Sequence, residues 1–186
     1  MKKIYETDHL ILRTIDPSYT KQVLDFYIRN KEFLAPWEPY REEFFYKPVF
    51  HRKTLRHELE LMNQLSLLRL WLFKKEDKKH TKAIGTISFS NIVRGCFQSC
   101  FLGYKIDKEE VQKGLMTEAL TKGIQIMFEE YKLHRIEANI IPRNTASINL
   151  VKKLGFENEG TSKKYLKING IWEDHCHMVL LNKRIE

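Results

Sequence analysis

The segment from Gly103 to Leu120 carries residues suited to phosphate chemistry. An apolar run typical of a strand is followed by a polar turn, by Lys113 and Gly114, and then by an amphipathic segment typical of a helix. Glycine allows a positive φ angle or a close backbone approach, and the first amides of a helix lack internal acceptors and carry the positive end of its dipole. The segment therefore predicts a pyrophosphate cradle at a helix start. A plain turn before a packing helix is the alternative interpretation.

Two other phosphate-binding motifs do not occur in the chain. The sequence contains neither the GxxxxGK[ST] pattern of nucleoside triphosphate loops nor the GxGxxG pattern of dinucleotide-binding domains. Both of those ligand classes are thereby disfavoured, and the cradle after residue 113 is left as the candidate phosphate site.

The apolar pattern predicts the elements that must position this segment. The 186 residues fit one domain and suffice to bury a core without disulfides or a metal. Strands are predicted at residues 9–15, 70–73, 83–89, 100–106, 136–140, 165–168 and 172–181. Helices are predicted from Pro17 (with Val23, Leu24, Tyr27 and Ile28 facing the core) and over 52–68, 116–131 and 144–155. This order predicts an α/β sandwich, a mixed sheet of about seven strands covered on both faces by about four helices.

Local signals refine three of these boundaries. Residues 33–39 contain two prolines, each of which favours extended geometry in the residue before it, so this segment is predicted to leave the helical conformation. Asn144 is a good N-cap, and Gly155 is a good residue to end the helix that follows. Asn169 and Gly170 form the strongest short hairpin signal in the chain.

The composition predicts a cytoplasmic protein that does not enter a membrane. The net charge is +8, but the lysines and arginines are scattered. Such a surface suits a polyanionic small molecule or an acidic or RNA-bound protein partner, and direct nucleic-acid binding is possible but not expected. The three cysteines form no CxxC pair, which predicts free thiols in a reducing compartment. Neither a signal peptide nor an apolar run of 18 residues is present in the sequence.

Two motifs resemble the GNAT N-acetyltransferases. The loop of that family, roughly Gln/Arg-Gly-x-Gly-x-Gly/Ala, falls on residues 111–116, and its Asn-rich helix ending in Gly-Phe falls on residues 144–156. Residues 30–39, 89–95, 113–116 and 165–175 are similar to the Rim branch, whose members acetylate ribosomal-protein N-termini, and most closely to the ribosomal-protein alanine acetyltransferases. The resemblance covers nearly the whole chain. It implies one GNAT domain over residues 1–186 with a mostly antiparallel sheet.

The resemblance also implies a reaction. Acetyl-CoA would be the co-substrate, and the acceptor would be a protein N-terminal α-amine, such as the N-terminal alanine of a small-subunit ribosomal protein, free or in a pre-ribosome. Acetylation of a small amine (a polyamine or an antibiotic) and a ribosome-assembly role with little catalysis remain alternatives. Both a monomer and a homodimer are compatible with the sequence.

The positions implied to bind the cofactor surround the cradle and the preceding strand. They are Tyr104, Lys105, Ile106, Gln112, Lys113, Gly114, Leu115, Met116, Thr117 and Asn144. The chain departs from the family at Val111, Gln112 and Met116, which narrows a cradle built from backbone amides without abolishing it. Many members also carry a tyrosine acid at the position of Val151, so a tyrosine-based acid is not expected here.

The implied catalytic groups are Ser147, Asn144, Ile106 and Glu38. A backbone N–H near Ile106 would stabilise the oxyanion. Ser147 would donate a hydrogen bond to the departing thiolate, although a helix-start serine that only caps the helix or faces solvent is the alternative. Glu38 is a candidate carboxylate near the amine, as are Glu173 and Asp174 on the last strand, and solvated surface charge is the alternative for each.

The acceptor-binding positions implied are Phe33, Trp37, Glu38, Asn91 and Glu173, where the two aromatic residues would alternatively anchor a loop. No Glu/His pair in the sequence predicts a general base. A peptide α-amine has a pKa near 7.7–8.0 and is partly neutral at pH 7, whereas a lysine amine near 10.4 is not, which favours the α-amine as acceptor. His175 and His177 share a strand face, but no third ligand follows at a suitable spacing, so no metal is predicted.

Overall fold

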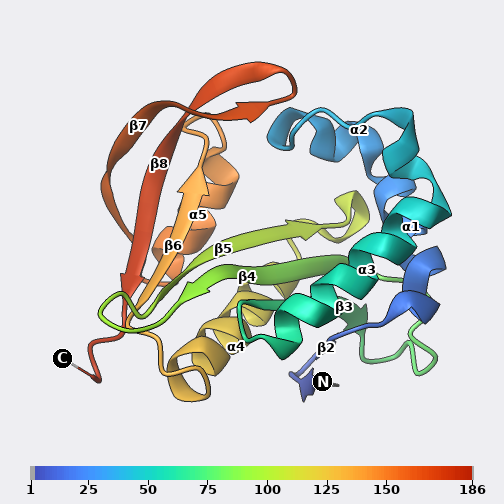
Figure 1. Cartoon of the computed structure of the whole chain (residues 1–186), viewed down its shortest axis with the longest axis horizontal. Coiled ribbons are helices and arrows are strands. Elements are labelled where there is room, and N and C mark those ends of the chain that lie inside the picture. Colours follow the sequence, from blue (N-terminus) through green and yellow to red (C-terminus); the bar gives the residue numbers. More distant parts are fainter. Residues whose placement is uncertain (1–2, 186) are drawn as a thin grey trace.

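A mixed sheet of eight strands organises the chain, as seen in the computed structural model, which describes residues 3–185 (Figure 1). The strands follow the spatial order β1-β2-β3-β4-β5-β6-β8-β7, and all neighbours are antiparallel except β5 and β6. The strands are β1 (Ile4–Glu6), β2 (Leu10–Arg13), β3 (Leu67–Lys74), β4 (Gly85–Val93), β5 (Ser99–Ile106), β6 (Arg135–Ile140), β7 (Glu157–Ile168) and β8 (Ile171–Leu181).

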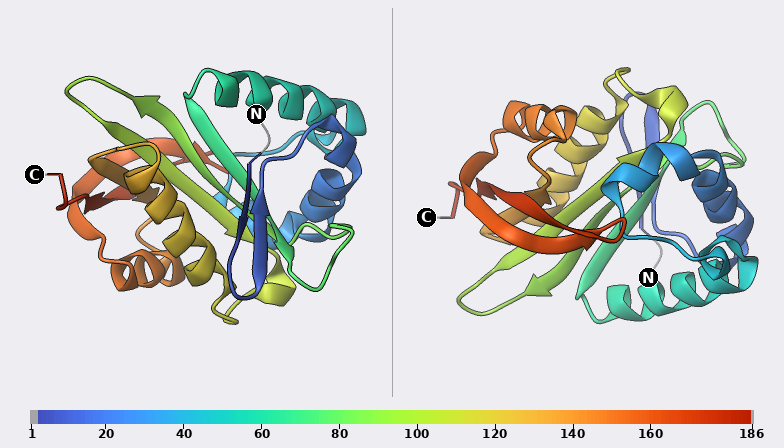
Figure 2. Two further views of the ribbon diagram at one scale, coloured as in Figure 1. Left: turned by 90° about the horizontal axis from the view of Figure 1, so that it is seen from below. Right: turned by 90° about the horizontal axis from the view of Figure 1, so that it is seen from above.

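Helices cover both faces of this sheet (Figure 2). The helices are α1 (Thr20–Arg29), α2 (Lys31–Leu34), α3 (Pro48–Asn63), α4 (Leu115–Glu129) and α5 (Thr145–Lys153), with 3-10 turns η1 (Pro17–Tyr19), η2 (Ala35–Trp37), η3 (Glu43–Tyr46) and η4 (Lys108–Glu110). One hydrophobic cluster joins α1 and α3 to one face, and the larger cluster joins α4 and α5 to the other. None of the helices within residues 3–185 is long and apolar enough to cross a membrane.

Alternation along β3 explains why both faces need a cover. Leu70 and Leu72 belong to the cluster under α4 and α5, whereas Trp71 and Phe73 belong to the cluster under α1 and α3. Successive side chains of a strand point to opposite faces, so the apolar run 70–73 is buried on both faces of the sheet. The prediction of a sandwich from these apolar runs is confirmed.

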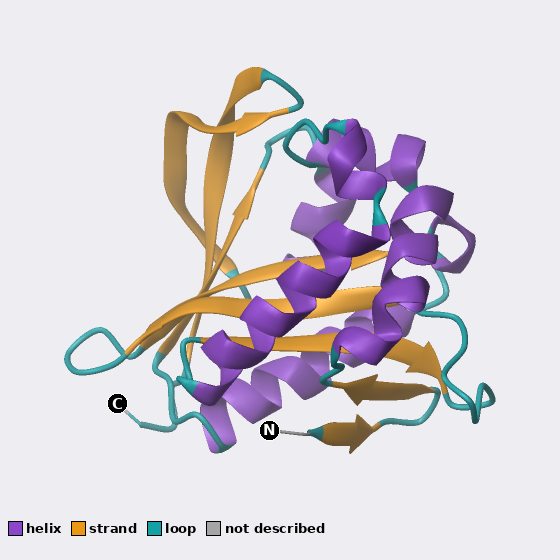
Figure 3. Ribbon diagram, turned by 45° about the vertical axis from the view of Figure 1, so that its right-hand side comes forward, coloured by secondary structure: helices purple, strands orange, loops and turns teal. Residues whose placement is uncertain are grey.

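The sheet divides between β5 and β6. These two parallel strands pair only from Ser99 to Phe101, opposite Arg135 to Glu137. Beyond that point they diverge, and β6, β7 and β8 curve away from the first five strands (Figure 3). The divergence opens a gap in the middle of the sheet, and the candidate active site lies at this gap.

Several predicted boundaries were wrong. The structure adds β1 at the N-terminal edge and α2 after α1 to the predicted elements, within the expected range of about seven strands and about four helices. The helix predicted over 52–68 spans Pro48–Asn63, because proline fits the first helical turn and because Leu67 and Leu68 pair with β4. Ile28 was predicted to face the core but is 53% exposed.

The segment 33–39 is also more helical than predicted. α2 continues directly into η2, and Ala35, which precedes a proline, is helical with φ −50° and ψ −40°. Proline loses no internal hydrogen bond in the first turn of such an element, so the chain becomes extended only at Glu38 (φ −121°, ψ 159°).

The closing hairpin confirms the turn predicted at Asn169 and Gly170, and its first strand, β7, is longer than predicted. Asn169 and Gly170 both take positive φ angles, of 43° and 86°, as a two-residue hairpin turn requires. β7 begins at Glu157, well before the predicted start at 165. Its first part is almost wholly exposed and lacks the apolar alternation from which strands are recognised.

Candidate active site

A cavity of about 810 Å³ lies where β5 and β6 separate. It is lined by Leu102–Ile106 of β5, by Ala138–Ile140 of β6, by the start of α4 and by α5. Six residues of the segment that follows α1 line it from the other direction: Phe33, Leu34, Trp37, Glu38, Pro39 and Arg41. The cavity therefore reaches both faces of the sheet.

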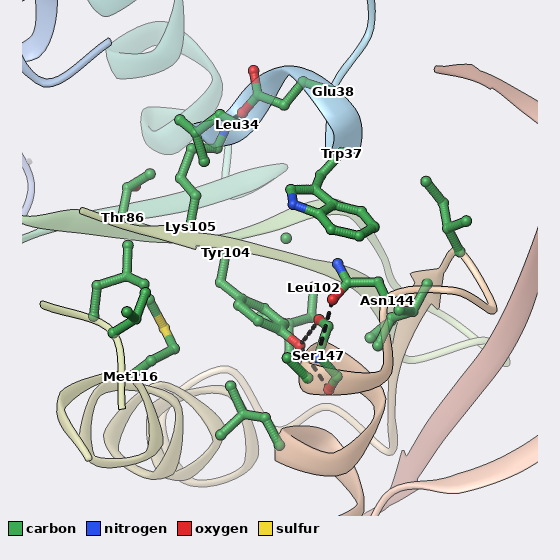
Figure 4. A pocket seen from close by; sticks show the side chains of 18 of the residues that line it. Leu34, Trp37, Glu38, Thr86, Leu102, Tyr104, Lys105, Met116, Asn144 and Ser147 are labelled. Atoms are coloured by element: carbon green, nitrogen blue, oxygen red, sulfur yellow. Dashed lines mark hydrogen bonds and ion pairs between the residues drawn. The ribbon is translucent and has the colours of Figure 1, made fainter. Parts of the chain in front are cut away.

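Tyr104 and Lys105 show how the cavity has two sides. As neighbours on β5 they point to opposite faces, Tyr104 toward α5 and Lys105 toward the segment after α2 (Figure 4). We call the first the α4–α5 side; it comprises Tyr104, Gln112, Gly114–Thr117, Asn144 and Ser147. We call the second the α1–α3 side; it comprises Phe33, Trp37, Glu38, Lys105, Asn139 and His175.

The helix start predicted after Gly114 is present on the α4–α5 side. Gly114 is the N-cap of α4 in the left-handed conformation, with φ 78° and ψ −11°. A Cβ atom added there would meet no atom within 4 Å, so the backbone angle and not the space calls for glycine. The first hydrogen bond of α4 runs from the Glu118 N–H to the Gly114 carbonyl oxygen at 3.1 Å. The N–H groups of residues 115–117 precede it and are free for an anion.

A buried ion pair anchors the strand end that leads into this cradle. Asp107 is 1% exposed, and Arg29 donates to its Oδ2 at 2.9 Å. Burial acts to raise the pKa of Asp107, but hydrogen bonds from the Glu109 N–H and from Arg29 outweigh it and hold the pKa below its usual value. Asn30 Oδ1 also accepts from the Lys108 N–H at 2.8 Å. The loop before α4 is therefore tied to α1.

The edge of β5 that faces the gap carries backbone donors. The Asp107 N–H donates to the Ile84 carbonyl oxygen at 2.8 Å, toward β4. Alternate residues of an antiparallel strand direct their backbone groups to the same side, so Tyr104 and Ile106 direct theirs away from β4 and into the gap. Within residues 3–185 no strand pairs with this edge beyond Phe101. The backbone N–H of Ile106, the position predicted for the oxyanion donor, is therefore directed into the gap.

A hydroxyl pair lies beside that edge. The Tyr104 hydroxyl hydrogen-bonds to Ser147 Oγ and lies 3.2 Å from the Ser147 carbonyl oxygen. Asn144 is the N-cap of α5, as predicted, and its Oδ1 accepts from the Ser147 N–H at 3.1 Å. Burial raises the pKa of Tyr104 to about 12, against a lowering by the Ser147 hydrogen bond. Tyr104 therefore stays protonated at neutral pH.

Charged residues on the α1–α3 side are already paired. Lys105 Nζ contacts Glu38 Oε1, and Arg41 lies 3.3 Å from Glu38 Oε2. Arg143 donates to the Pro36 carbonyl oxygen at 3.0 Å and to Glu173 at 2.7 Å. These contacts connect the segment after α2 with the loop before α5 and with β8.

Trp37 forms part of the same wall. The Arg143 guanidinium lies 4.9 Å from the centre of its ring, and the indole side chain lines the cavity (Figure 4). Of the two interpretations left open for this tryptophan, its position favours a cavity wall.

The sequence of residues 9–157, which is most of the chain, matches the acetyltransferase (GNAT) domain family.

The chain belongs to the GNAT acetyltransferase family.

Named relatives make the relationship more specific. The [ribosomal protein uS5]-alanine N-acetyltransferase of Escherichia coli strain K12 is 41% identical over 169 residues, which cover 91% of this chain and 86% of that protein. The structure of a ribosomal-protein-S5-alanine acetyltransferase from Vibrio fischeri aligns with a TM-score of 0.91 and 38% identity over 99% of both chains. Mycobacterium smegmatis RimJ, solved with CoA-disulfide, has the same fold with a TM-score of 0.87 at 23% identity, over 95% of this chain and 83% of that one.

Most of the positions predicted for this GNAT enzyme meet in the cavity. Those that line it are Phe33, Trp37, Glu38, Tyr104, Lys105, Ile106, Gln112, Gly114, Leu115, Met116, Thr117, Asn144 and Ser147. Glu38 lines the cavity, but its carboxylate is paired and not free. Its carboxylate is held between Lys105 and Arg41, an arrangement unsuited to a free base.

Three predicted positions do not line the cavity. Asn91 is exposed at the irregularity of β4, with a positive φ of 49°. Lys113 forms an ion pair with Glu110 at 3.0 Å, and the Glu173 carboxylate forms one with Arg143 at 2.7 Å. The structure therefore gives no support to an acceptor contact by Asn91.

The Tyr104 hydroxyl was the feature that sequence reasoning missed. Val151, at the position where many GNAT enzymes carry a tyrosine acid, is fully buried in the core. The hydroxyl comes instead from β5, and alternation along that strand was the one signal that placed it on the same face as α5.

Among the described residues, no group of three or more His, Cys, Asp or Glu side chains could hold a metal ion. His177 is a satisfied sheet histidine. Its Nδ1 lies 2.8 Å from Glu137 Oε1, and its Nε2 lies 2.7 Å from Ser162 Oγ.

Proposed function

We propose that this GNAT enzyme transfers the acetyl group of acetyl-CoA to the N-terminal α-amine of a protein, and that its acceptor is a ribosomal protein that begins with alanine. The observation that carries the proposal is one cavity that joins free helix-start amides on the α4–α5 side to a polar wall on the α1–α3 side. The relative at 41% identity is named for the same reaction on uS5. An acceptor made on the ribosome is consistent with a cytoplasmic enzyme.

The α4–α5 side fits the co-substrate. The free N–H groups of residues 115–117 suit its diphosphate, because a helix start offers both donors and a partial positive charge. The unpaired edge of β5 at Tyr104 and Ile106 suits the amides of its pantetheine arm, which would then lie like an added strand. Positioning of this kind contributes several kcal/mol to transfer through effective molarity.

Transfer requires one bond to form and one to break. The amine nitrogen bonds to the thioester carbonyl carbon, the C–S bond breaks, and the sulfur leaves with the electron pair. The Ile106 N–H is directed toward the gap, where it would stabilise the oxyanion. Ser147 Oγ would donate a hydrogen bond to the leaving sulfur while accepting one from Tyr104.

Tyr104 acts in this scheme by holding Ser147 and not by giving up its proton. Its pKa is about 12, and an ordinary thiol has a pKa near 8.5, so full proton transfer to the thiolate is unfavourable. A hydrogen bond to the sulfur needs no such transfer, and it stabilises the charge as it develops.

An α-amine is the acceptor that this site handles most easily. With a pKa near 7.7–8.0, roughly a tenth to a fifth of an N-terminal amine is neutral at pH 7, several hundredfold more than for lysine. Both glutamates that line the cavity are paired, Glu38 with Lys105 and Arg41, and Glu110 with Lys74 and Lys113. Neither is free to deprotonate a lysine.

A matched pair of peptides tests the proposal. Thiol release from acetyl-CoA is measured with a peptide that begins with alanine and contains an internal lysine, and with the same peptide acetylated at its N-terminus. We expect turnover of the first and only the acceptor-free rate with the second. Equal turnover of both would assign a lysine acceptor, and turnover of spermidine alone would assign a small amine. Either result would overturn the proposal.

A further inference from the structure

A buried hydrogen-bond acceptor in the cavity wall has no donor among the described residues. Asn139 lies on β6 and lines the α1–α3 side, and its Oδ1 is shielded from solvent without a hydrogen bond from any described residue. An unpaired buried acceptor destabilises a protein, so such an atom in a binding cavity indicates a donor that arrives with the ligand.

His175 of β8 lines the same side with one nitrogen uncommitted. It is 2% exposed, and its Nδ1 lies 3.0 Å from the Glu173 carbonyl oxygen. A carbonyl oxygen only accepts, so Nδ1 carries the hydrogen and Nε2 of the neutral ring is an acceptor. Within residues 3–185 no hydrogen bond to this Nε2 is formed, and the ring is part of the cavity wall.

His177, two residues further along β8, differs in this respect. Both of its ring nitrogens are engaged, by Glu137 and by Ser162, and it does not line the cavity. The two histidines share a strand and a face, but only His175 combines a free acceptor nitrogen with access to the site.

The other candidate bases in the cavity are ion-paired. Glu38 contacts two cations and Glu110 contacts two more. Glu173, outside the cavity lining, is bound by Arg143. Asn139 is a hydrogen-bond acceptor but has no useful basicity. His175 is therefore the cavity residue left with an unpaired basic atom among those described.

We propose that Asn139 and His175 form the amine-binding site. Asn139 Oδ1 accepts one N–H of the acceptor amine and positions its lone pair. His175 Nε2 takes the proton that the nitrogen releases as the new N–C bond forms, while the thiolate leaves with the electrons of the C–S bond. This proposal rests on the proposed acetyl transfer, but it holds for any amine acceptor.

The first test separates proton transfer from folding. His175→Asn keeps a donor for the Glu173 carbonyl oxygen and removes the basic nitrogen. We expect kcat to fall about 100-fold or more, the range for loss of a general base, with the Kd for CoA within about twofold of wild type. His177→Asn is the matched control, and its kcat should stay within about threefold. A kcat of His175→Asn within threefold of wild type would overturn the proposal.

Chemical rescue supplies a readout that a structural role would not move. His175→Ala leaves a space the size of the ring, and added imidazole should restore kcat at least about fivefold, while His177→Ala should not respond. Asn139→Ala should raise the KM of the peptide about tenfold with a smaller change in kcat, as expected for a lost buried hydrogen bond. Absence of rescue together with an unchanged KM would refute the assignment.

The same assays distinguish failure of this proposal from failure of the proposed function. The wild-type rate across alanine peptides, lysine peptides and spermidine reports which amine is the acceptor. The ratio of His175→Asn to wild type, measured on whichever amine is turned over, reports the proton acceptor.

Discussion

The two sides of the cavity are built from different kinds of groups. The α4–α5 side offers mainly backbone donors, from the start of α4 and from the edge of β5, supplemented by the hydroxyls of Tyr104 and Ser147. The α1–α3 side offers side chains, which come from η2, β5, β6 and β8 and whose charges are largely paired with one another.

This difference matches what each side would bind. Main-chain groups can bind a diphosphate and a chain of amides whatever side chains the same residues carry. Gln112 and Met116 would therefore be compatible with such binding. An amine has to be oriented and deprotonated, which demands particular side chains at particular positions. Substitutions on the two sides should therefore affect different steps.

Among variants of the α4–α5 side, Ser147→Ala should show the largest effect. It removes a hydrogen bond to a developing charge, worth about 1.5–3 kcal/mol, so kcat should fall about 10–100-fold. Tyr104→Phe should cost less, and the double variant should resemble Ser147→Ala, because both hydroxyls act through one contact. Steady-state kinetics at saturating acetyl-CoA measure this.

Ser162→Ala is the control for that experiment, since Ser162 bonds to His177 outside the cavity. A kcat of Ser147→Ala within twofold of Ser162→Ala would contradict the role given to the hydroxyl pair on the α4–α5 side.

Gly114→Val should weaken CoA binding by about tenfold, or about 1.4 kcal/mol. The left-handed φ of 78° is costly for an L-residue, and relief of that strain would move the free amides of α4. Gly95→Val is a matched control, because Gly95 also has a positive φ of 70° and open space, in the turn between β4 and β5. Titration calorimetry should show weaker binding for the first variant only; equal affinities would argue against the cradle.

Acid should destabilise the fold through His51 of α3. Its ring is 2% exposed, stacks on Tyr27 at 5.3 Å and packs against Phe45, and burial lowers its pKa to about 4. The unfolded chain, with a pKa of 6.5, binds the proton more readily, so stability is fully present above pH 6.5 and is lost as the pH falls toward 4. We expect a loss of about 1–2 kcal/mol between pH 7 and pH 5.

Denaturant unfolding at the two pH values measures this loss. His51→Phe keeps a ring in the cluster but cannot be protonated, so its free energy of unfolding should fall less between pH 7 and pH 5. An identical fall in the variant and in the wild type would show that another group controls the acid response.

Arg143→Lys should have the smallest effect. Lysine keeps the charge near Glu173 but loses the planar contact with Trp37 and the second hydrogen bond, to Pro36. An exposed pair of this kind is worth about 0.2–1 kcal/mol, so the KM of the peptide should rise no more than about fivefold. The Kd for CoA should not change, and a change in that Kd would indicate that the two sides are coupled.

Local conformational demands made much of the α4–α5 side predictable. Gly114 needs a left-handed backbone angle, and Asn144 accepts the bond of an N-cap, so both features could be recognised from residues close in the chain. The same reasoning failed at α2 and η2, because a proline signal marks where a hydrogen bond is lost and does not exclude a short helical turn before it.

The pairs that distinguish the cavity join residues far apart in the chain. Tyr104 and Ser147 are 43 positions apart, and Glu38 and Lys105 are 67 apart. No local pattern encodes such distances, because sheet register and the separation of β5 from β6 bring the partners together. The paired state of Glu38 is therefore visible only in the folded chain.

By itself the sequence determined the two-faced sandwich, the helix start after Gly114 and the capped helix at Asn144, because periodicity and backbone angles are properties of neighbouring residues. The tertiary structure decided which side chains share the cavity, which carboxylates are neutralised, and which histidine keeps a free nitrogen. Those outcomes depend on hydrogen-bond partners that only the packed strands bring within reach.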